Sequence, residues 1–147
     1  NAGFLLPVQI GSKEIGDRPG MRIQDELYAL RNAQRLLGPD WNRRIQAAYL
    51  LGEAGAVEAV ADLEAVALEC QHPELVKSAI RALNRIQAEA AILALSRVLE
   101  NSPDEAAAAM CLEGLLHAVE HGSPAARQAL AVRGQQRLAA PKQIGYR

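Results

Sequence analysis

Equivalent residues recur every 32 positions through the middle of this 147-residue chain. Leu51, Leu83 and Leu115 keep this spacing, and a small residue stands four positions before each leucine. The small residues are Ala47, Ala79 and Cys111. A fixed period of this length is typical of arrays in which each repeat is one supersecondary unit and neighbouring units share a continuous core. Residues four apart lie on one face of a helix, so the pattern predicts helices that pack closely in successive units.

Composition and local spacing predict that each unit is a pair of helices. Hydrophobic residues make up 50% of the chain but aromatic residues only 3%, so we expect an aliphatic core rich in alanine and leucine, which favour helix. Val57, Val60, Leu63 and Val66 show the same helical spacing in one of the return segments. The expected helices cover residues 21–37, 40–51, 57–69, 75–86, 89–100, 104–121 and 124–138.

Capping residues mark several of the expected helix ends. Gly38-Pro39 is expected to end the first helix, as a C′ glycine followed by proline does. Asp40 is the expected N-cap of the second helix. Ser102, followed by Pro103 and then Glu105, forms a predicted capping box.

These elements predict an all-α fold, a short α-solenoid of about three antiparallel helical hairpins after one extra N-terminal helix. The solenoid is expected over residues 21–138 as a single domain. Residues 1–20 are predicted to form an irregular, extended arm, because glycine and proline occur too densely there for a stable helix. Residues 139–147 are the predicted tail.

The first helix and turn of the units resemble HEAT-like repeats. Residues 43–55 read RRIQAAYLLGEAG, and residues 75–84, LVKSAIRALN, resemble the same element with asparagine in place of glycine. A third copy, residues 107–116, keeps Leu115. The resemblance covers roughly residues 40–121 and is closest to the short-repeat subgroup of phycobilin lyase-like proteins and many bacterial scaffolds. It implies an α-solenoid but no particular activity, because such repeats serve unrelated tasks.

The charge balance narrows the range of partners. Sixteen basic and 17 acidic residues are spread along the chain, giving a formal charge of −1. An extended DNA-binding surface needs a clustered excess of lysine and arginine, so we expect no nucleic-acid partner. Five arginines resemble the basic face of HEAT-like DNA glycosylases and keep nucleic-acid binding as a further alternative, although we expect them to be solvated and salt-paired. They are Arg43, Arg44, Arg81, Arg85 and Arg97.

Cysteine usage and hydropathy bear on the compartment. Cys70 and Cys111 are far apart in sequence and belong to no CxxC pair, so we expect both to be reduced in a cytoplasmic protein. No apolar run approaches the ~20 residues that a membrane helix needs, and we expect no membrane partner. The chain begins with Asn1 rather than methionine, which we interpret as processing or excision, so an exported form stays an alternative.

The outward face of the return helices is the predicted partner-binding surface. In short solenoids these helices line the concave side, and successive copies present equivalent positions. Ala90 and Ala94 are small and apolar where a solvated face would carry charge, and with Arg97 they predict a shallow seat for a partner helix or peptide. The competing interpretation is that these alanines simply favour helix. The predicted set is Glu58, Asp62, Glu69, Ala90, Ala94, Arg97 and Asn101, with Ala65 on the same stripe.

The function that the sequence favours is therefore a non-catalytic protein–protein interaction or scaffold module without a cofactor. Its protein partner is not identified by the sequence. A homodimer formed through the apolar arm stays an alternative.

Glu113, His117 and His121, spaced four apart on one helix face, are the alternative site. Two histidines at this spacing can bind a metal, and a carboxylate one turn away can act as a third ligand or a base. The paired His-Glu dipeptides of iron-binding HEAT-like hydroxylases are absent. We therefore favour histidines placed in the last turns of a helix, where positive charge is stabilising. A metal-dependent enzyme or metal-binding protein stays the alternative function.

Two further features have structural interpretations that we prefer. Cys70 with His72 suggests a nucleophile and a base, but no third group is evident to orient them. Trp41, the only tryptophan, is expected to join adjacent repeats rather than to anchor a partner.

Overall fold

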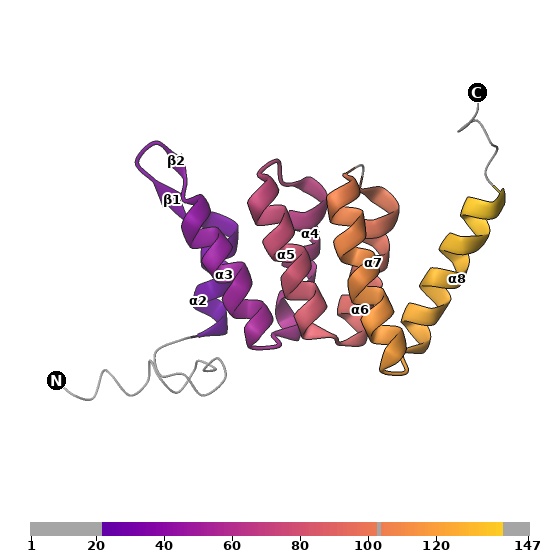
Figure 1. Ribbon diagram of the computed structural model, residues 1–147. Helices are drawn as coiled ribbons and strands as arrows, with labels where there is room; N and C mark the ends of the chain where they lie inside the picture. Colours follow the sequence, from indigo (N-terminus) through magenta and orange to yellow (C-terminus); the bar gives the residue numbers. More distant parts are fainter. Residues whose placement is uncertain (1–21, 103, 140–147) are drawn as a thin grey trace, which may run out of the picture.

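The computed structural model describes residues 22–102 and 104–139 of the chain. The predicted arm over residues 1–20 lies outside the described residues, as does the predicted tail from residue 140 onward. The described part confirms the all-α expectation, with helical hairpins standing side by side in a row (Figure 1). None of the helices described is long and apolar enough to cross a membrane.

The elements follow one another in a regular order, interrupted by one small hairpin. They are α2 (Ile23–Asn32), β1 (Gln34–Arg35), β2 (Gly38–Pro39), α3 (Trp41–Glu53), the short 3-10 helix η2 (Val57–Ala59), α4 (Val60–Glu69), α5 (Pro73–Ile86), α6 (Glu89–Asn101), α7 (Glu105–Glu120) and α8 (Pro124–Ala139).

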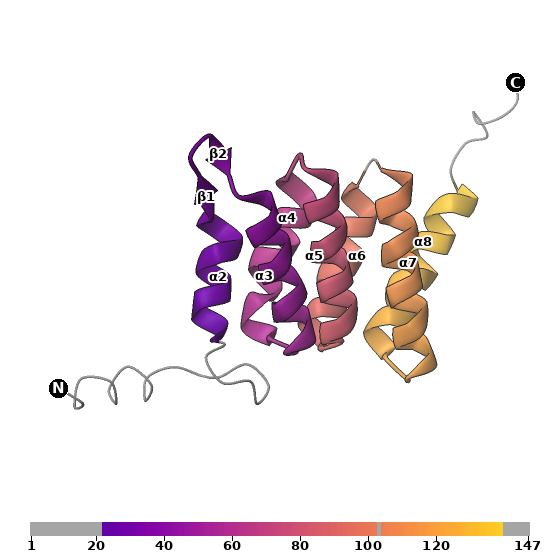
Figure 2. The same ribbon diagram turned by 60° about the vertical axis from the view of Figure 1, so that its left-hand side comes forward.

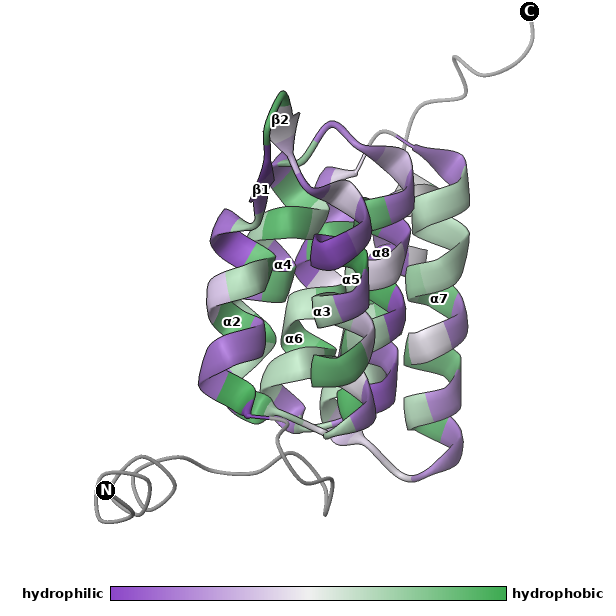
Figure 3. Ribbon diagram, turned by 90° about the vertical axis from the view of Figure 1, so that its left-hand side faces the viewer, coloured by the Kyte–Doolittle hydropathy of each residue, from purple (hydrophilic) through white to green (hydrophobic). Residues whose placement is uncertain are grey.

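The helices form two layers. Helices α3, α5 and α7 pack side by side in one layer, called here the first-helix layer (Figure 2). Helices α2, α4, α6 and α8 form the other, called here the return-helix layer. Figure 3 looks along the row from the end that holds α2 and shows helices with both apolar (green) and polar (purple) sides. Residues of the 32-residue period meet between the layers, where Leu51, Leu83 and Leu115 are all 0% exposed.

The hairpin turns show where the repeat is regular and where it drifts. Gly55 ends the first hairpin turn with a φ of 65°, and Gln87, at the equivalent position 32 residues later, has a φ of 55°. Gly122 takes this role in the third hairpin with a φ of 87°, 35 residues after Gln87. The left-handed conformation closes a helix end tightly. Helix α7 is therefore longer than α3 and α5, and α8 begins 35 rather than 32 residues after the start of α6.

The first predicted helix is too long. Helix α2 ends at Asn32, and residues 34–39 form a two-stranded antiparallel hairpin instead. Gly38, with a φ of 144°, helps the chain to reverse, and the Asp40 N–H donates to the Ala33 carbonyl at 2.9 Å to close the loop. Leu36 and Leu37 lie in the turn and are each 98% exposed. Gly38 thus serves the hairpin and not a helix C-terminus.

The observed N-cap residue matches the prediction at α3 but not at α7. Asp40 caps α3, as predicted, because its carboxylate accepts from the Arg43 N–H at 3.0 Å. At α7 the prediction of Ser102 as N-cap is wrong. Asp104 is the cap and accepts from the Ala107 N–H at 3.0 Å, whereas the Ser102 hydroxyl accepts from the Asp104 N–H at 3.3 Å. Both residues are good acceptors, and the N-cap lies two residues later than expected.

Neighbouring first helices approach so closely that each interface needs a glycine. A Cβ added to Gly52 on α3 would lie 2.6 Å from the Cα of Ala82 on α5. The equivalent pair 32 residues later is Asn84 on α5 and Gly114 on α7, where an added Cβ would overlap the Asn84 amide. The Asn84 Nδ2 donates to the Met110 carbonyl at 3.2 Å across this second interface. One small side chain in each pair therefore sets the spacing of the row.

We expect Gly52→Ala to lower the free energy of unfolding by about 1–3 kcal/mol, because the new methyl group forces two backbones apart. Gly134→Ala on α8 is the matched control. A Cβ at residue 134 meets nothing within 4 Å, so this change is expected to stabilise the helix by about 0.5–1 kcal/mol. Urea unfolding followed by circular dichroism measures both, and equal stability of the two variants would contradict the close approach.

Candidate functional site

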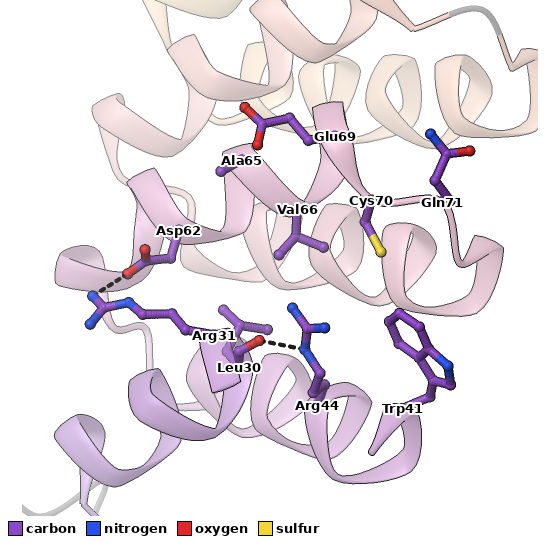
Figure 4. Close-up of a pocket in the computed structure, with 10 residues that line it drawn as sticks. All are labelled: Leu30, Arg31, Trp41, Arg44, Asp62, Ala65, Val66, Glu69, Cys70 and Gln71. Carbon is purple, nitrogen blue, oxygen red and sulfur yellow. Dashed lines mark hydrogen bonds and ion pairs between the residues drawn. The ribbon is translucent and has the colours of Figure 1, made fainter. Parts of the chain in front are cut away.

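A groove of about 600 Å³ lies where α2, the start of α3 and α4 meet (Figure 4). We call it the α4 groove. It contains Asp62, Ala65 and Glu69 of the predicted stripe and adds residues that the sequence did not single out for this surface. Its full lining is Leu30, Arg31, Trp41, Arg44, Asp62, Ala65, Val66, Glu69, Cys70 and Gln71.

Most charged groups of the α4 groove are already engaged. The Arg31 Nη2 lies 2.6 Å from the Asp62 Oδ2 and joins α2 to α4. The hydrogen bond to Asp62, with its negative charge, raises the pKa of Arg31. The Arg44 Nε donates to the Leu30 carbonyl at 2.7 Å, satisfying one of the carbonyls left open at the end of α2. Glu69 is exposed and has no ion-pair partner among the residues described.

Trp41 joins the first two hairpins at one end of the groove. Its ring stacks on His72 with centroids 4.5 Å apart, and the Arg44 guanidinium lies 5.3 Å from the Trp41 ring centre. Trp41 starts α3, and His72 is the N-cap residue of α5, where its Nδ1 accepts from the Leu75 N–H at 3.3 Å. The prediction that Trp41 joins adjacent repeats is confirmed.

A second hollow, of about 360 Å³, lies between α4 and α6. We call it the α4–α6 hollow. The Arg97 Nε and Nη2 donate to the two carboxylate oxygens of Glu64 at 2.6 and 2.8 Å, forming a bidentate pair between neighbouring return helices. This bond raises the pKa of Arg97. The lining is Val57, Glu58, Val60, Ala61, Glu64, Ala90, Leu93 and Arg97.

The predicted partner-binding residues are thus divided between the two hollows. Asp62 and Glu69 line the α4 groove, while Glu58, Ala90 and Arg97 line the α4–α6 hollow. The set does not form one continuous seat, because α4 contributes to both hollows and lies between them. Glu64, Trp41 and Arg31 belong to this surface and were missed, since their partners are distant in sequence.

Two members of the predicted set lie elsewhere. The prediction that Ala94 faces outward is wrong, because Ala94 is 0% exposed. Helix α6 packs against α4, α5, α7 and α8, so its buried face is wider than the repeat alone suggests and includes the position equivalent to Asp62. Asn101 is exposed, and its Nδ2 donates to the Arg97 carbonyl at 2.8 Å near the end of its own helix.

The five arginines considered for nucleic-acid binding do not form one basic surface. The Arg43 Nη1 pairs with the buried Glu26 at 2.7 Å, Arg44 bonds to α2, and Arg97 pairs with Glu64. For Arg43 and Arg97 the predicted salt pairing is confirmed. Arg44, Arg81 and Arg85 form no ion pair with any residue described, so for these three the pairing expectation is wrong, although Arg81 and Arg85 are exposed to solvent as expected.

The alternative metal site is not assembled. No group of three His, Cys, Asp or Glu residues in the described part of the chain is placed to hold a metal ion. The His117 and His121 rings lie 4.3 Å apart, and the His121 Nδ1 lies 2.9 Å from the His117 carbonyl oxygen. Glu113 and His117 line a separate hollow of about 340 Å³ between α5 and α7. His117 lies in the last turn of α7 and His121 at its C-cap, as expected.

The cysteines are both free. Burial raises the pKa of the Cys111 thiol to about 12, which confirms Cys111 as a packing residue. Cys70 is partly exposed in the α4 groove, and its Sγ accepts from the His72 N–H at 3.4 Å. Because the His72 Nδ1 caps α5, this histidine is not arranged as a base for the thiol.

The comparisons with known proteins concern the same segment. A family model described as HEAT repeats matches residues 30–115, more than half of the chain. The match contains every residue that lines the α4 groove and the α4–α6 hollow. Neither a curated protein nor a solved structure matches the chain.

We expect a thiol reagent to modify Cys70 in the folded protein at about pH 8, while Cys111 reacts only after unfolding. The folded pKa of Cys111 is raised above its ordinary value of 9.0. Its protonated thiol therefore favours the folded state below pH 9, and this contribution is lost as the pH rises toward about 12. Peptide mapping by mass spectrometry with and without denaturant measures both sites. Equal labelling of the two cysteines in the folded protein would contradict the buried position of Cys111.

Proposed function

Because the chain belongs to the HEAT repeat family, we propose that it is a protein-interaction module that binds its partner through the return-helix layer. HEAT repeats are commonly protein-interaction scaffolds. The observation that carries the proposal is the pair of hollows beside α4, which lie next to each other on one layer and contain five of the seven predicted residues.

The chemistry of this surface favours a basic partner. Helices η2, α4 and α6 carry six acidic residues and a single arginine. That arginine is bonded to Glu64, whereas Glu69, Glu89 and Glu100 are exposed without an ion-pair partner among the described residues. Complementary charge directs association and excludes wrong partners. The six acidic residues are Glu58, Asp62, Glu64, Glu69, Glu89 and Glu100.

Exposed apolar side chains on the same elements supply a second requirement. Val57, Leu68 and Leu93 are 41–50% exposed. Val57 and Leu93 line the α4–α6 hollow directly. A partner that buries them needs apolar residues of its own, and an amphipathic helix with lysine or arginine beside its apolar face satisfies both requirements.

Two helices of the first-helix layer, α3 and α5, carry an excess of positive charge, whereas the third, α7, carries three acidic residues and no lysine or arginine. Helices α3 and α5 carry five basic residues against Glu53 and Glu74. Arg81 and Arg85 are exposed and form no ion pair among the described residues, so a basic helix is repelled from α5. The five basic residues are Arg43, Arg44, Lys77, Arg81 and Arg85.

A pair of designed peptides tests the proposed partner chemistry. We expect an amphipathic Leu/Lys helix to shift backbone amide signals of α4 and α6 in NMR spectra of the ¹⁵N-labelled chain. Its affinity is expected to fall as salt is added, because exposed charges are screened. The same peptide with glutamate in place of lysine is expected to leave these signals unchanged.

Charge-reversal variants locate the binding surface. The double variant Glu69→Lys, Glu100→Lys is expected to lower the affinity for the Leu/Lys peptide by about three- to tenfold, since it replaces attraction by repulsion. Glu113→Lys makes the same kind of change on the first-helix layer and is the matched control, expected to bind as the unmodified chain does. Amide shifts concentrated on α3, α5 and α7, or equal loss in the control, would refute the proposed surface.

A further inference from the structure

A fourth hollow, of about 370 Å³, lies in the first-helix layer between α3 and α5. We call it the α3–α5 pocket. It contains two arginines and no acidic residue, whereas the other hollows described above each contain at least one carboxylate. Its lining is Ile45, Gln46, Tyr49, Ser78, Arg81, Ala82 and Arg85.

The two arginines form no ion pair with any described residue, although both also line the hollow between α5 and α7 that contains Glu113. Arg81 makes no hydrogen bond or ion pair with any residue of the described chain, and the Arg85 guanidinium lies 5.2 Å from the centre of the Tyr49 ring. With Lys77, whose Nζ lies 4.0 Å from a Glu74 carboxylate oxygen, they form a row of like charges spaced four residues apart on α5. Like charges at this spacing destabilise a helix, and a bound anion would remove that cost.

Ser78 provides a second, independent observation. It is only 9% exposed and lines the pocket. Its hydroxyl forms no hydrogen bond within the described residues, whereas Glu26, the other buried polar side chain, is bonded to Arg43. Among the described residues only the Asn84 Oδ1 is a fully buried side-chain polar atom without a hydrogen-bond partner, so the Ser78 hydroxyl reaches the pocket and is free to donate to a ligand there.

The remaining walls are largely apolar. Ile45, Ala82 and the Tyr49 ring line the pocket beside the charged groups. A volume of about 370 Å³ falls within the ~300–1,000 Å³ typical of small-molecule sites, which combine apolar walls with a few placed polar groups.

We propose that the α3–α5 pocket binds a small organic oxyanion, with a phosphate or carboxylate group against Arg81, Arg85 and Ser78. Arginine provides several N–H donors in a fixed fork that matches both groups. A flat apolar body lies against Ile45, Ala82 and Tyr49. The pocket is in the layer opposite to the proposed partner surface, so the two sites can be tested separately.

Phenyl phosphate and benzoate are the probes, titrated into the ¹⁵N-labelled chain. We expect at least one of them to shift amide signals of α3 and α5 saturably and to raise the melting temperature. Inorganic phosphate is expected to bind more weakly because it lacks the apolar body, and benzyl alcohol, which lacks the charge, is expected not to bind. No saturable shift from either probe up to about 10 mM would overturn the proposal.

Three variants separate a binding role from a structural one. Arg81→Gln is expected to lower the affinity for the probe at least about fivefold, because hydrogen bonds to charged groups are strong. Ser78→Ala is expected to weaken probe binding about threefold while leaving the ligand-free chain about equally stable, since the hydroxyl makes no hydrogen bond within the described residues. Arg127→Gln on α8 is the matched control and is expected to change nothing. Equal probe affinity of Arg81→Gln and Arg127→Gln, with both helical by circular dichroism, would overturn the proposal.

Discussion

The close approach of neighbouring first helices is the constraint on which the rest of the structure depends. At Gly52 and Ala82, and again at Asn84 and Gly114, no room is left for a second full-sized side chain. The spacing of the first-helix layer follows from these contacts, and tight turns at Gly55, Gln87 and Gly122 carry it to the return helices.

Two ion pairs connect adjacent helices of the return-helix layer. Arg31 pairs with Asp62 between α2 and α4, and Arg97 pairs with Glu64 between α4 and α6. Exposed pairs of this kind contribute only about 0–1 kcal/mol each, so their main effect is to fix how adjacent return helices align. They also neutralise Arg31 and Arg97 and leave Glu69, Glu89 and Glu100 without an ion-pair partner among the described residues.

Much of the fold could be predicted from the sequence, because a 32-residue period and aliphatic helical spacing report directly on packing. The buried Leu51, Leu83 and Leu115 follow from that period. The burial of Ala94 could not be predicted, since it depends on how many helices surround α6. The hairpin at residues 34–39 was missed because a short apolar pair fits a helix and a turn equally well. For the candidate site, the acids of α4 could be predicted, but Glu64 and the α3–α5 pocket depend on residues brought together from separate helices.

A double-mutant cycle at the second first-helix interface tests the central role of close packing most directly. The account predicts that Gly114→Ala lowers the free energy of unfolding in urea by about 1–3 kcal/mol, because the new methyl group meets the Asn84 amide. In the Asn84→Ala background, where the amide is absent, adding Gly114→Ala is predicted to cost much less than it costs in the unmodified chain. If instead the two changes add within about 0.5 kcal/mol, the residues do not share one tight contact, and the account is contradicted.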